Sequence, residues 1–289
     1  MRTIREAFLR ASSFLRERGV VEAGASAELL LQHVLQVNRT KLLVMWDDSF
    51  EDSAFDRLWE MLQRRADGEP VQYIMGEAYF YGRPFQVSKA VLIPRPETEL
   101  LAERIVLLGR ELWGAEGTPR AVDIGTGSGA IAVTLAAECP AWRVAASDIS
   151  PAALEVARRN ARANGVEERV QFFEGDLLEP AAREFGGNID IVVSNPPYIC
   201  SADMDGLQRE VRDYEPHLAL DGGPDGLVLY RRMLAQMAEF DVWPRLAGFE
   251  CGMGQARELS RLLQETGRWS KVMIVDDYAG IERHVIGVR

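Results

Sequence analysis

Asp123-Ile124-Gly125-Thr126-Gly127-Ser128-Gly129-Ala130 joins an apolar run at residues 121–124 to helix-forming residues at 130–138. Glycines let the backbone turn sharply and approach a ligand closely. The N-terminus of the helix that follows would present free N–H groups to a carboxylate or a phosphate. A strand, a glycine-rich turn and a helix in this order are typical of a nucleotide-binding site in an α/β protein.

The chain beyond this loop alternates between strand and helix patterns. This alternation predicts an α/β fold, an open sheet with helices on both faces. The glycine loop would then lie at the carboxyl edge of the sheet, where open α/β sheets bind their ligands. Strands are expected at residues 121–124, 143–147, 170–174, 189–193, 245–250, 271–275 and 284–288, with helices between them.

The first part of the chain has a different pattern. From residue 3 to about 66, apolar residues recur at helical spacing, which predicts a small helical module. Residues 68–87 then interleave glycines and prolines with aromatic and branched residues, including Val71 and Tyr73, and this favours a strand-rich connector that forms a hairpin. A chain of 289 residues is long enough for about two domains. We therefore expect a helical domain at 1–68, a β-hairpin connector at 69–93 and an α/β domain at 94–289.

Acidic residues near the glycine loop bear on the identity of its ligand. The loop alone also satisfies the dinucleotide pattern G-x-G-x-x-G/A. Asp123, however, places a negative charge beside the loop, which would repel a pyrophosphate and suits the ammonium group of a methionine moiety. Asp148, at the end of the next strand, is placed to hold ribose hydroxyls, and Asp176 either contacts an adenine amino group or caps its turn. S-adenosyl-L-methionine therefore fits this region better than a dinucleotide.

Asn195-Pro196-Pro197-Tyr198 follows the apolar run at 191–193. Each proline fixes its own φ and lacks an N–H, and a residue before proline is held extended, so the carbonyls here have few local donors. The Asn195 amide oxygen and the Pro196 carbonyl can then accept both hydrogens of one planar NH2 group, while the Tyr198 ring covers its face. This acceptor clamp predicts chemistry at a nitrogen atom, with Asn195, Pro196 and Tyr198 as catalytic residues.

Composition argues against several other classes of function. The formal net charge of −11 disfavours direct nucleic-acid binding, which needs clustered Lys and Arg. The three cysteines are far apart and form no C-x-x-C pair, so we expect neither disulfides nor a metal site. No apolar run approaches the roughly 18 residues of a membrane helix, and the first residues lack the core of a signal peptide. We therefore expect a cytoplasmic protein with no membrane partner.

The motifs together resemble the class I methyltransferases and, within them, the peptide chain release factor glutamine methyltransferases. The resemblance covers most of the chain and includes further segments at 93–99, 216–220, 223–231, 250–255 and 277–283. It implies a Rossmann-like, seven-stranded methyltransferase domain with S-adenosylmethionine as the methyl donor. It also implies a partner and substrate, a class I release factor that is methylated on the side-chain amide nitrogen of the glutamine in its Gly-Gly-Gln motif. The helical domain would dock that release factor.

Carried over by position, the resemblance assigns two groups of site residues. The substrate glutamine would be held by Asn195, Pro196, Pro197 and Tyr198. Leu177 departs from the family pattern, in which an aromatic residue often lies beside the adenine, although a branched aliphatic side chain still packs on the ring. The cofactor would be bound by Gly125, Thr126, Gly127, Ser128, Gly129, Asp148 and Leu177, with Asp123, Asp176 and Asn195 beside them.

The expected reaction is direct in-line transfer of a methyl group from a sulfonium to an amide nitrogen. Such a step needs alignment and a dry pocket but no dedicated general base. Glu250 and Gln255 are accordingly interpreted as a strand end and a helix start, and His284 as a core or surface residue. Three other functions remain open: a glutamine methyltransferase acting on a ribosomal protein, a nucleic-acid adenine methyltransferase, and a non-catalytic S-adenosylmethionine sensor.

Overall fold

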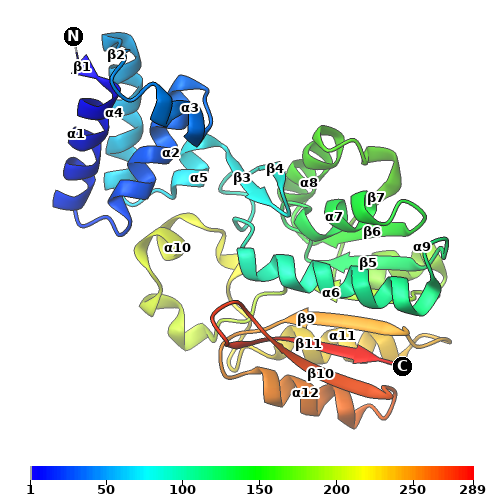
Figure 1. Ribbon diagram of the computed structural model, residues 1–289. Helices are drawn as coiled ribbons and strands as arrows, with labels where there is room; N and C mark the ends of the chain where they lie inside the picture. Colours follow the sequence, from blue (N-terminus) through cyan, green and yellow to red (C-terminus); the bar gives the residue numbers. More distant parts are fainter. Residues whose placement is uncertain (1) are drawn as a thin grey trace. The chain divides into compact units, whose positions relative to one another are not determined.

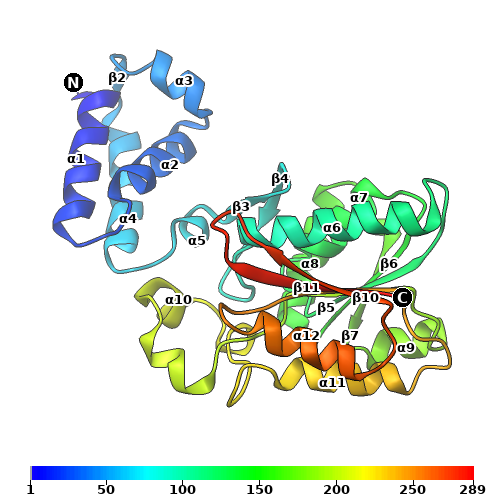
Figure 2. The same cartoon turned by 60° about the horizontal axis from the view of Figure 1, so that its bottom comes forward.

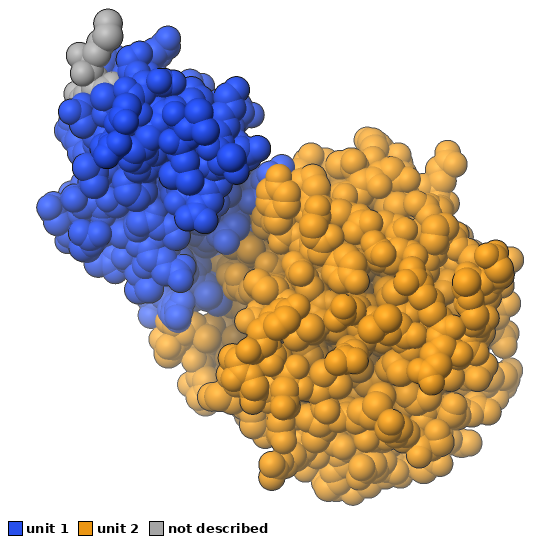
Figure 3. All heavy atoms as spheres, in the orientation of Figure 1, with its two compact units in different colours: residues 1–77, 208–214 blue, residues 78–207, 215–289 orange. Residues whose placement is uncertain are grey.

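The computed structural model describes residues 2–289. The chain forms two compact units, one of residues 1–77 with 208–214 and the other of residues 78–207 with 215–289 (Figure 3). The segment at 208–214 therefore belongs to the first unit, although the sequence on either side of it belongs to the second. None of the helices in the described part of the chain is long and apolar enough to cross a membrane.

The first unit is helical, as expected from its apolar spacing. It contains α1 (Ile4–Glu17), α2 (Ala23–Leu35), α3 (Arg39–Val44), α4 (Asp52–Ala66), α5 (Val71–Met75) and α10 (Arg209–Tyr214), with the two-residue strands β1 (Arg2–Thr3) and β2 (Ser49–Phe50). Helix α1 begins with a capping box, in which Thr3 and Glu6 each accept the backbone N–H of the other. The apolar faces of α1, α2 and α4 form one buried core.

Helix α5 lies where the sequence predicted strand, and that expectation is wrong. The helix starts after Pro70 and ends at Gly76, which has a φ of 76°. Glycine adopts this left-handed conformation without a Cβ penalty, so it is a common residue at a helix C-terminus. Three of the five side chains of α5 are buried, and the helix contacts α2 and α4. The mixture of branched and aromatic residues here serves helix packing and not strand pairing.

The expected hairpin is formed by β3 (Glu77–Phe80) and β4 (Arg83–Gln86). Tyr81 and Gly82 make its two-residue turn, with φ values of 52° and 72°. Positive φ at both central residues defines a type I′ turn, whose twist matches that of paired strands. Phe80 and Phe85 are fully buried and meet edge to face in the core of the second unit.

The second unit is built on a seven-stranded sheet with the order β10-β11-β9-β8-β5-β6-β7 (Figure 1). Strand β11 runs antiparallel to both of its neighbours, and the remaining pairs are parallel. All seven strands overlap the segments predicted from the sequence: β5 (Arg120–Ile124), β6 (Arg143–Asp148), β7 (Val170–Glu174), β8 (Ile191–Ser194), β9 (Leu246–Glu250), β10 (Lys271–Asp276) and β11 (Glu282–Val288).

Helices cover both faces of this sheet (Figure 2). One face packs on α6 (Pro96–Trp113), α7 (Ala130–Glu138) and α8 (Pro151–Ala163), and the other packs on α9 (Glu179–Phe185), α11 (Val228–Ala238) and α12 (Ala256–Glu265). Alternate residues of β5 face opposite layers, because Ala121 belongs to one buried cluster and Val122 to the other. Short 3-10 turns occur at Glu167–Arg169, Ser201–Gly206 and His217–Ala219.

Candidate active site

The glycine loop and the Asn-Pro-Pro-Tyr segment lie side by side. Strands β5 and β8 are parallel neighbours, and Ile124 of β5 is paired with Ser194 of β8. Gly125 and Asn195 therefore leave the same edge of the sheet from adjacent strands. The chain order of the strands reverses between β5 and β8, and a crevice at such a switch point is where open α/β sheets bind ligands.

A cavity of about 250 Å³ occupies this crevice. Within the described chain, its lining brings together most of the predicted site residues: Asp123, Gly125, Thr126, Gly127, Ser128, Asp148, Asp176, Leu177, Asn195 and Pro197. Pro196, Tyr198 and Gly129 are not part of this lining. Pro196 is buried, and Tyr198 is half-buried. The roles predicted for Pro196 and Tyr198 remain predictions.

Two glycines of the loop show why no larger residue would serve. Gly127 has a φ of 55°, and its N–H donates to Asp148 Oδ2 at 2.9 Å. Gly129 has a φ of 83°, and a Cβ there would lie 3.1 Å from the Cβ of Ala157 in α8. The left-handed backbone favours glycine at both positions, and at Gly129 the close packing of α8 adds a second restriction.

Asp123 is the acidic residue at the floor of the cavity. Its Oδ2 accepts hydrogen bonds from the Thr126 hydroxyl at 2.6 Å and the Ala132 N–H at 3.1 Å. Its Oδ1 is buried and has no hydrogen-bond partner within residues 2–289. Burial raises the pKa of Asp123 to about 7, partly offset by these two hydrogen bonds. A buried carboxylate oxygen without a donor fits the ammonium group of a methionine moiety.

Asp148 is held in place by the backbone around it. Its Oδ1 accepts the Ser150 N–H at 2.9 Å, while Oδ2 takes the Gly127 N–H already described. Burial raises the pKa of this carboxyl group, and the hydrogen bonds from backbone N–H groups act in the opposite direction. Each oxygen keeps a further lone pair, so the carboxylate can accept hydrogen bonds from a vicinal diol such as ribose.

The turn after β7 forms another part of the cavity wall. Asp176 makes an ion pair with Arg232 of α11, so its carboxylate is already engaged by a cation. Leu177 has a φ of 51°, which is unusual for a branched residue, and its carbonyl accepts the Ser147 hydroxyl at 2.7 Å. Both residues line the cavity, and their predicted contacts with the cofactor remain predictions. The interaction of Asp176 with Arg232 was not foreseen.

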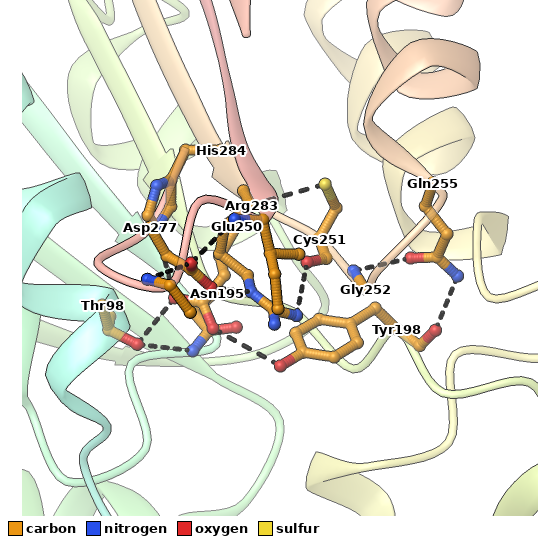
Figure 4. Close-up of polar contacts among 12 residues, drawn as sticks. Thr98, Asn195, Tyr198, Glu250, Cys251, Gly252, Gln255, Asp277, Arg283 and His284 are labelled. Atoms are coloured by element: carbon orange, nitrogen blue, oxygen red, sulfur yellow. Dashed lines mark hydrogen bonds and ion pairs between the residues drawn. The ribbon is translucent and has the colours of Figure 1, made fainter. Parts of the chain in front are cut away.

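Asn195 is part of a network of side chains that sequence reasoning did not reveal (Figure 4). Its Nδ2 donates to the Thr98 hydroxyl at 3.0 Å, and Thr98 in turn donates to Glu250 Oε2 at 2.6 Å. The Tyr198 hydroxyl makes a longer hydrogen bond, 3.4 Å, to Glu250 Oε1. Two residues of the clamp are thus connected to the Glu250 carboxylate at the end of β9, Tyr198 directly and Asn195 through Thr98.

Glu250 is 1% exposed, and burial raises its pKa to about 7. Thr98, Arg283 and Tyr198 counteract that rise through hydrogen bonds and charge. His284 Nε2 lies 3.8 Å from Glu250 Oε2, but burial lowers the pKa of His284 to about 4. The imidazole is therefore neutral near pH 7 and does not compensate the negative charge of the carboxylate. The interpretation of Glu250 as only a strand end is therefore incomplete. His284 is a core residue, as one of the two expected alternatives had it.

The Tyr198 backbone is fixed by residues from two later loops. Gln255 Nε2 donates to the Tyr198 carbonyl at 2.8 Å, and Gln255 Oε1 accepts the Gly252 N–H at 2.8 Å. A Cβ on Gly226 would lie 2.2 Å from the Tyr198 carbonyl oxygen, and one on Gly222 would lie 2.7 Å from Tyr198 Cα. Gln255 directly precedes α12, in agreement with the expected helix start, and also supports the clamp.

Thr98, Glu250 and Gln255 support the clamp, and sequence reasoning missed this role. Each lies in a segment that contributed to the family resemblance, at 93–99 or 250–255, and that was the only available signal. Spacing along the chain gave no indication of a contact, because Thr98 and Asn195 are 97 positions apart.

Comparisons with known proteins agree with this architecture. A family model described as "PrmC N-terminal domain" matches residues 6–76, and one described as "Methyltransferase small domain" matches residues 100–223. Among solved structures, the N-terminal domain of human METTL16 in complex with SAH matches with a TM-score of 0.54 and 18% identity, covering 89% of this chain and 90% of that one. This likeness concerns the fold alone. The sheet order, the glycine loop and the adjacent clamp define a class I methyltransferase.

Curated relatives narrow the class to one family. The release factor glutamine methyltransferase of Bacillus cereus is 42% identical over 280 residues, which cover 97% of each chain. The protein of the same description from Bacillus subtilis is 40% identical and covers 99% of this chain and 97% of its own. The chain belongs to the release factor glutamine methyltransferase family.

Proposed function

We propose that this protein transfers the methyl group of S-adenosylmethionine to the side-chain amide nitrogen (N5) of the glutamine in the Gly-Gly-Gln motif of class I peptide chain release factors. One observation carries the proposal: the glycine-loop cavity and the Asn195 amide open onto the same crevice. The family to which the chain belongs supports the choice of substrate.

Bound S-adenosylmethionine would supply an electrophilic methyl group on a sulfonium centre. Asp123 would hold the ammonium group through its unpartnered Oδ1, and Asp148 would hold the ribose hydroxyls. Leu177 would pack against the adenine. The largely apolar walls of the crevice would exclude water, which favours the loss of charge in the transition state.

The Asn195 amide oxygen and the Pro196 carbonyl would accept the two hydrogens of the substrate NH2 group, with the Tyr198 ring beside it. Hydrogen bonds of this kind place electron density on a nitrogen that is otherwise conjugated with its carbonyl. After transfer, the surplus proton would leave toward the Pro196 carbonyl or water, so that alignment and not a general base supplies most of the acceleration.

We further propose that the helical domain, residues 1–68, docks the release factor and that residues 69–93 connect it to the catalytic domain, 94–289. The helical unit exposes apolar side chains, with Leu9, Leu43 and Val44 between 54% and 81% exposed. Leu43 and Val44 are adjacent in α3, and exposed apolar side chains that lie together favour contact with another protein. Val44→Asp is expected to raise KM for the release factor while leaving the dissociation constant of the cofactor unchanged.

The test is a methylation assay with labelled S-adenosylmethionine and three separate acceptors: a class I release factor, a ribosomal protein extract and duplex DNA. Label on the release factor, located at the glutamine by mass spectrometry, is the expected result. Label only on a ribosomal protein would favour a glutamine methyltransferase with a different docking partner. Label only on DNA would overturn the substrate assignment, and cofactor binding without any transfer would indicate a sensor.

A further inference from the structure

The orientation of the Asn195 side-chain amide determines what the clamp can recognise. An amide carries an acceptor oxygen on one side and a donor NH2 on the other, and the two ends have nearly the same shape. With the oxygen toward the substrate, Asn195 accepts a hydrogen from a primary amide. With its NH2 group toward the substrate, Asn195 would place one donor against the donor NH2 of the substrate amide. It would instead attract a carboxylate, which has only acceptors.

The hydrogen bonds behind Asn195 fix this orientation. Glu250 Oε2, when ionised, can only accept, so the single hydroxyl hydrogen of Thr98 points to it across 2.6 Å. Only lone pairs of the Thr98 oxygen then remain for Asn195, which must turn its NH2 group toward them, as the 3.0 Å contact from Nδ2 shows. Above pH 7, with Glu250 ionised, the direction of donation therefore runs from Asn195 through Thr98 to Glu250.

Other groups around Glu250 maintain this direction. Oε1 accepts the Tyr198 hydroxyl, and Tyr230 donates to the Glu250 carbonyl at 2.6 Å, so neither tyrosine competes with Thr98 for Oε2. Burial raises the pKa of Glu250 to about 7 and the positive charge of Arg283 counteracts that rise, so the carboxylate form predominates above pH 7. Thr98 is 5% exposed and Glu250 is 1% exposed, so water has little access to replace either partner.

We propose that Thr98 and Glu250 are positioning residues that lock the Asn195 amide with its oxygen toward the substrate, and that this lock makes the clamp select a primary amide over a carboxylate. The inference rests on the proposed function, because it assumes that a glutamine amide enters the crevice. The lock would explain why the enzyme selects glutamine over glutamate, two residues that differ only in having an amide or a carboxylate at the end of the side chain.

Thr98→Val tests the lock, since it keeps the shape of the side chain and removes the hydroxyl. We expect kcat with the release factor to fall by about ten- to a hundredfold, with the dissociation constant of S-adenosylmethionine within about twofold of wild type. The decisive measurement is inhibition by a release factor whose motif reads Gly-Gly-Glu. The ratio of its inhibition constant to KM for the normal substrate should decrease in Thr98→Val, because the freed Asn195 amide can present its NH2 group to the glutamate carboxylate.

Two control variants separate orientation from packing. Thr98→Ser retains the hydroxyl and is expected to recover most of the lost kcat and the wild-type preference against Gly-Gly-Glu. Thr134→Val makes the same change in α7, where the buried hydroxyl has no hydrogen-bond partner within residues 2–289. Thr134→Val should leave kcat with the release factor and the inhibition constant of the Gly-Gly-Glu variant at wild-type values.

Two results would overturn the lock. One is an unchanged preference against Gly-Gly-Glu in Thr98→Val. The other is a loss of kcat in Thr98→Ser as large as the loss in Thr98→Val. Should the valine variant not fold, Thr98→Ala gives the same decision, because alanine also removes the hydroxyl that holds the Asn195 NH2 group. Wild-type enzyme that fails to methylate the release factor would refute the proposed function itself, whereas active wild type with unaffected variants would refute only the lock.

Discussion

The two halves of the crevice are held together in different ways. In the glycine loop, some supporting hydrogen bonds are local, such as the one from Thr126 to Asp123, and the others come from segments no more than 32 positions away, at Ser147, Asp148 and Asn160. In the clamp, every support for Asn195 and Tyr198 comes from a distant segment, through Thr98, Glu250 and Gln255. The cofactor half therefore depends on a continuous part of the chain from β5 to α8, whereas the acceptor half depends on segments 52 to 97 positions apart and hence on the completed fold.

The comparison predicts that the two halves can be disabled separately, and Asn195→Ala should show this most strongly. The variant removes one acceptor at the reacting nitrogen and nothing from the glycine loop. We expect kcat to fall by about a hundredfold or more, with cofactor affinity within about twofold of wild type. Single-turnover kinetics and calorimetric titration of S-adenosylmethionine measure the two quantities.

Asn188→Ala is the matched control for this change, because Asn188 is exposed and its side chain donates to the nearby Gly186 carbonyl. It should have wild-type kinetics. Parallel losses of turnover and cofactor affinity in Asn195→Ala would show that the two halves are not independent.

Gly226→Ala probes the dependence of the clamp on distant loops. The new Cβ would lie 2.2 Å from both the Tyr198 carbonyl oxygen and Gln255 Nε2, and the φ of Gly226 is 70°. We expect kcat to fall by roughly tenfold or more as the clamp is displaced, and the free energy of unfolding to decrease by about 2 kcal/mol from strain and crowding. Denaturant unfolding and steady-state kinetics would measure these effects.

Gly267→Ala separates backbone strain from crowding. Gly267 has a φ of 64°, and a Cβ there would meet nothing within 4 Å. This variant should lose about 1 kcal/mol of stability from the left-handed backbone and retain its kcat. Equal kinetic losses in the two glycine variants would contradict a specific role of Gly226 in supporting Tyr198.

Asp123→Asn tests the cofactor half and carries a pH signature. Burial raises the pKa of Asp123 to about 7, so in the free protein the carboxyl group is protonated below that pH. The cofactor ammonium prefers the carboxylate and must displace this proton, which weakens binding by up to about tenfold per pH unit below 7. Wild-type affinity should therefore rise with pH and level off above about 7.

In Asp123→Asn the affinity at pH 8 should be about tenfold weaker than in wild type, and this rise with pH should disappear. Asp148→Asn serves as a comparison, because it removes the proposed ribose acceptor but leaves Asp123 in place, so the rise through pH 7 should persist. Calorimetric titrations between pH 5.5 and 8.5 distinguish the two. A flat wild-type profile would exclude the proposed contact between Asp123 and the ammonium group.

The same contrast explains what the sequence could predict. All seven strands, the glycine loop and the hairpin were predicted because each has a local signature of alternation, glycine spacing or turn residues. Helix α5 was predicted wrongly because five residues rich in branched and aromatic side chains are ambiguous until their packing partners are known. Thr98 and Glu250 were missed as site residues because their relation to Asn195 exists only after three distant segments have met.

Leu177→Phe gives the smallest predicted effect and concerns the one position where the cofactor half departs from the family pattern. Leu177 lines the cavity with a φ of 51°, and phenylalanine in this conformation is no more strained than leucine. An aromatic ring stacked on adenine contributes about 0.5–1.5 kcal/mol beyond its buried area. Affinity for S-adenosylmethionine should therefore tighten by about two- to tenfold, with little change in kcat.

Leu177→Ala provides the opposite change, since it removes the apolar contact and should weaken cofactor binding. The pair also tests whether the cofactor half acts alone, because neither variant changes any residue that supports Asn195. KM for the release factor, measured at saturating cofactor, should then stay at the wild-type value in both. A shift in that constant would show that Leu177 affects the clamp, and weaker cofactor binding by the phenylalanine variant would contradict the predicted contact with adenine.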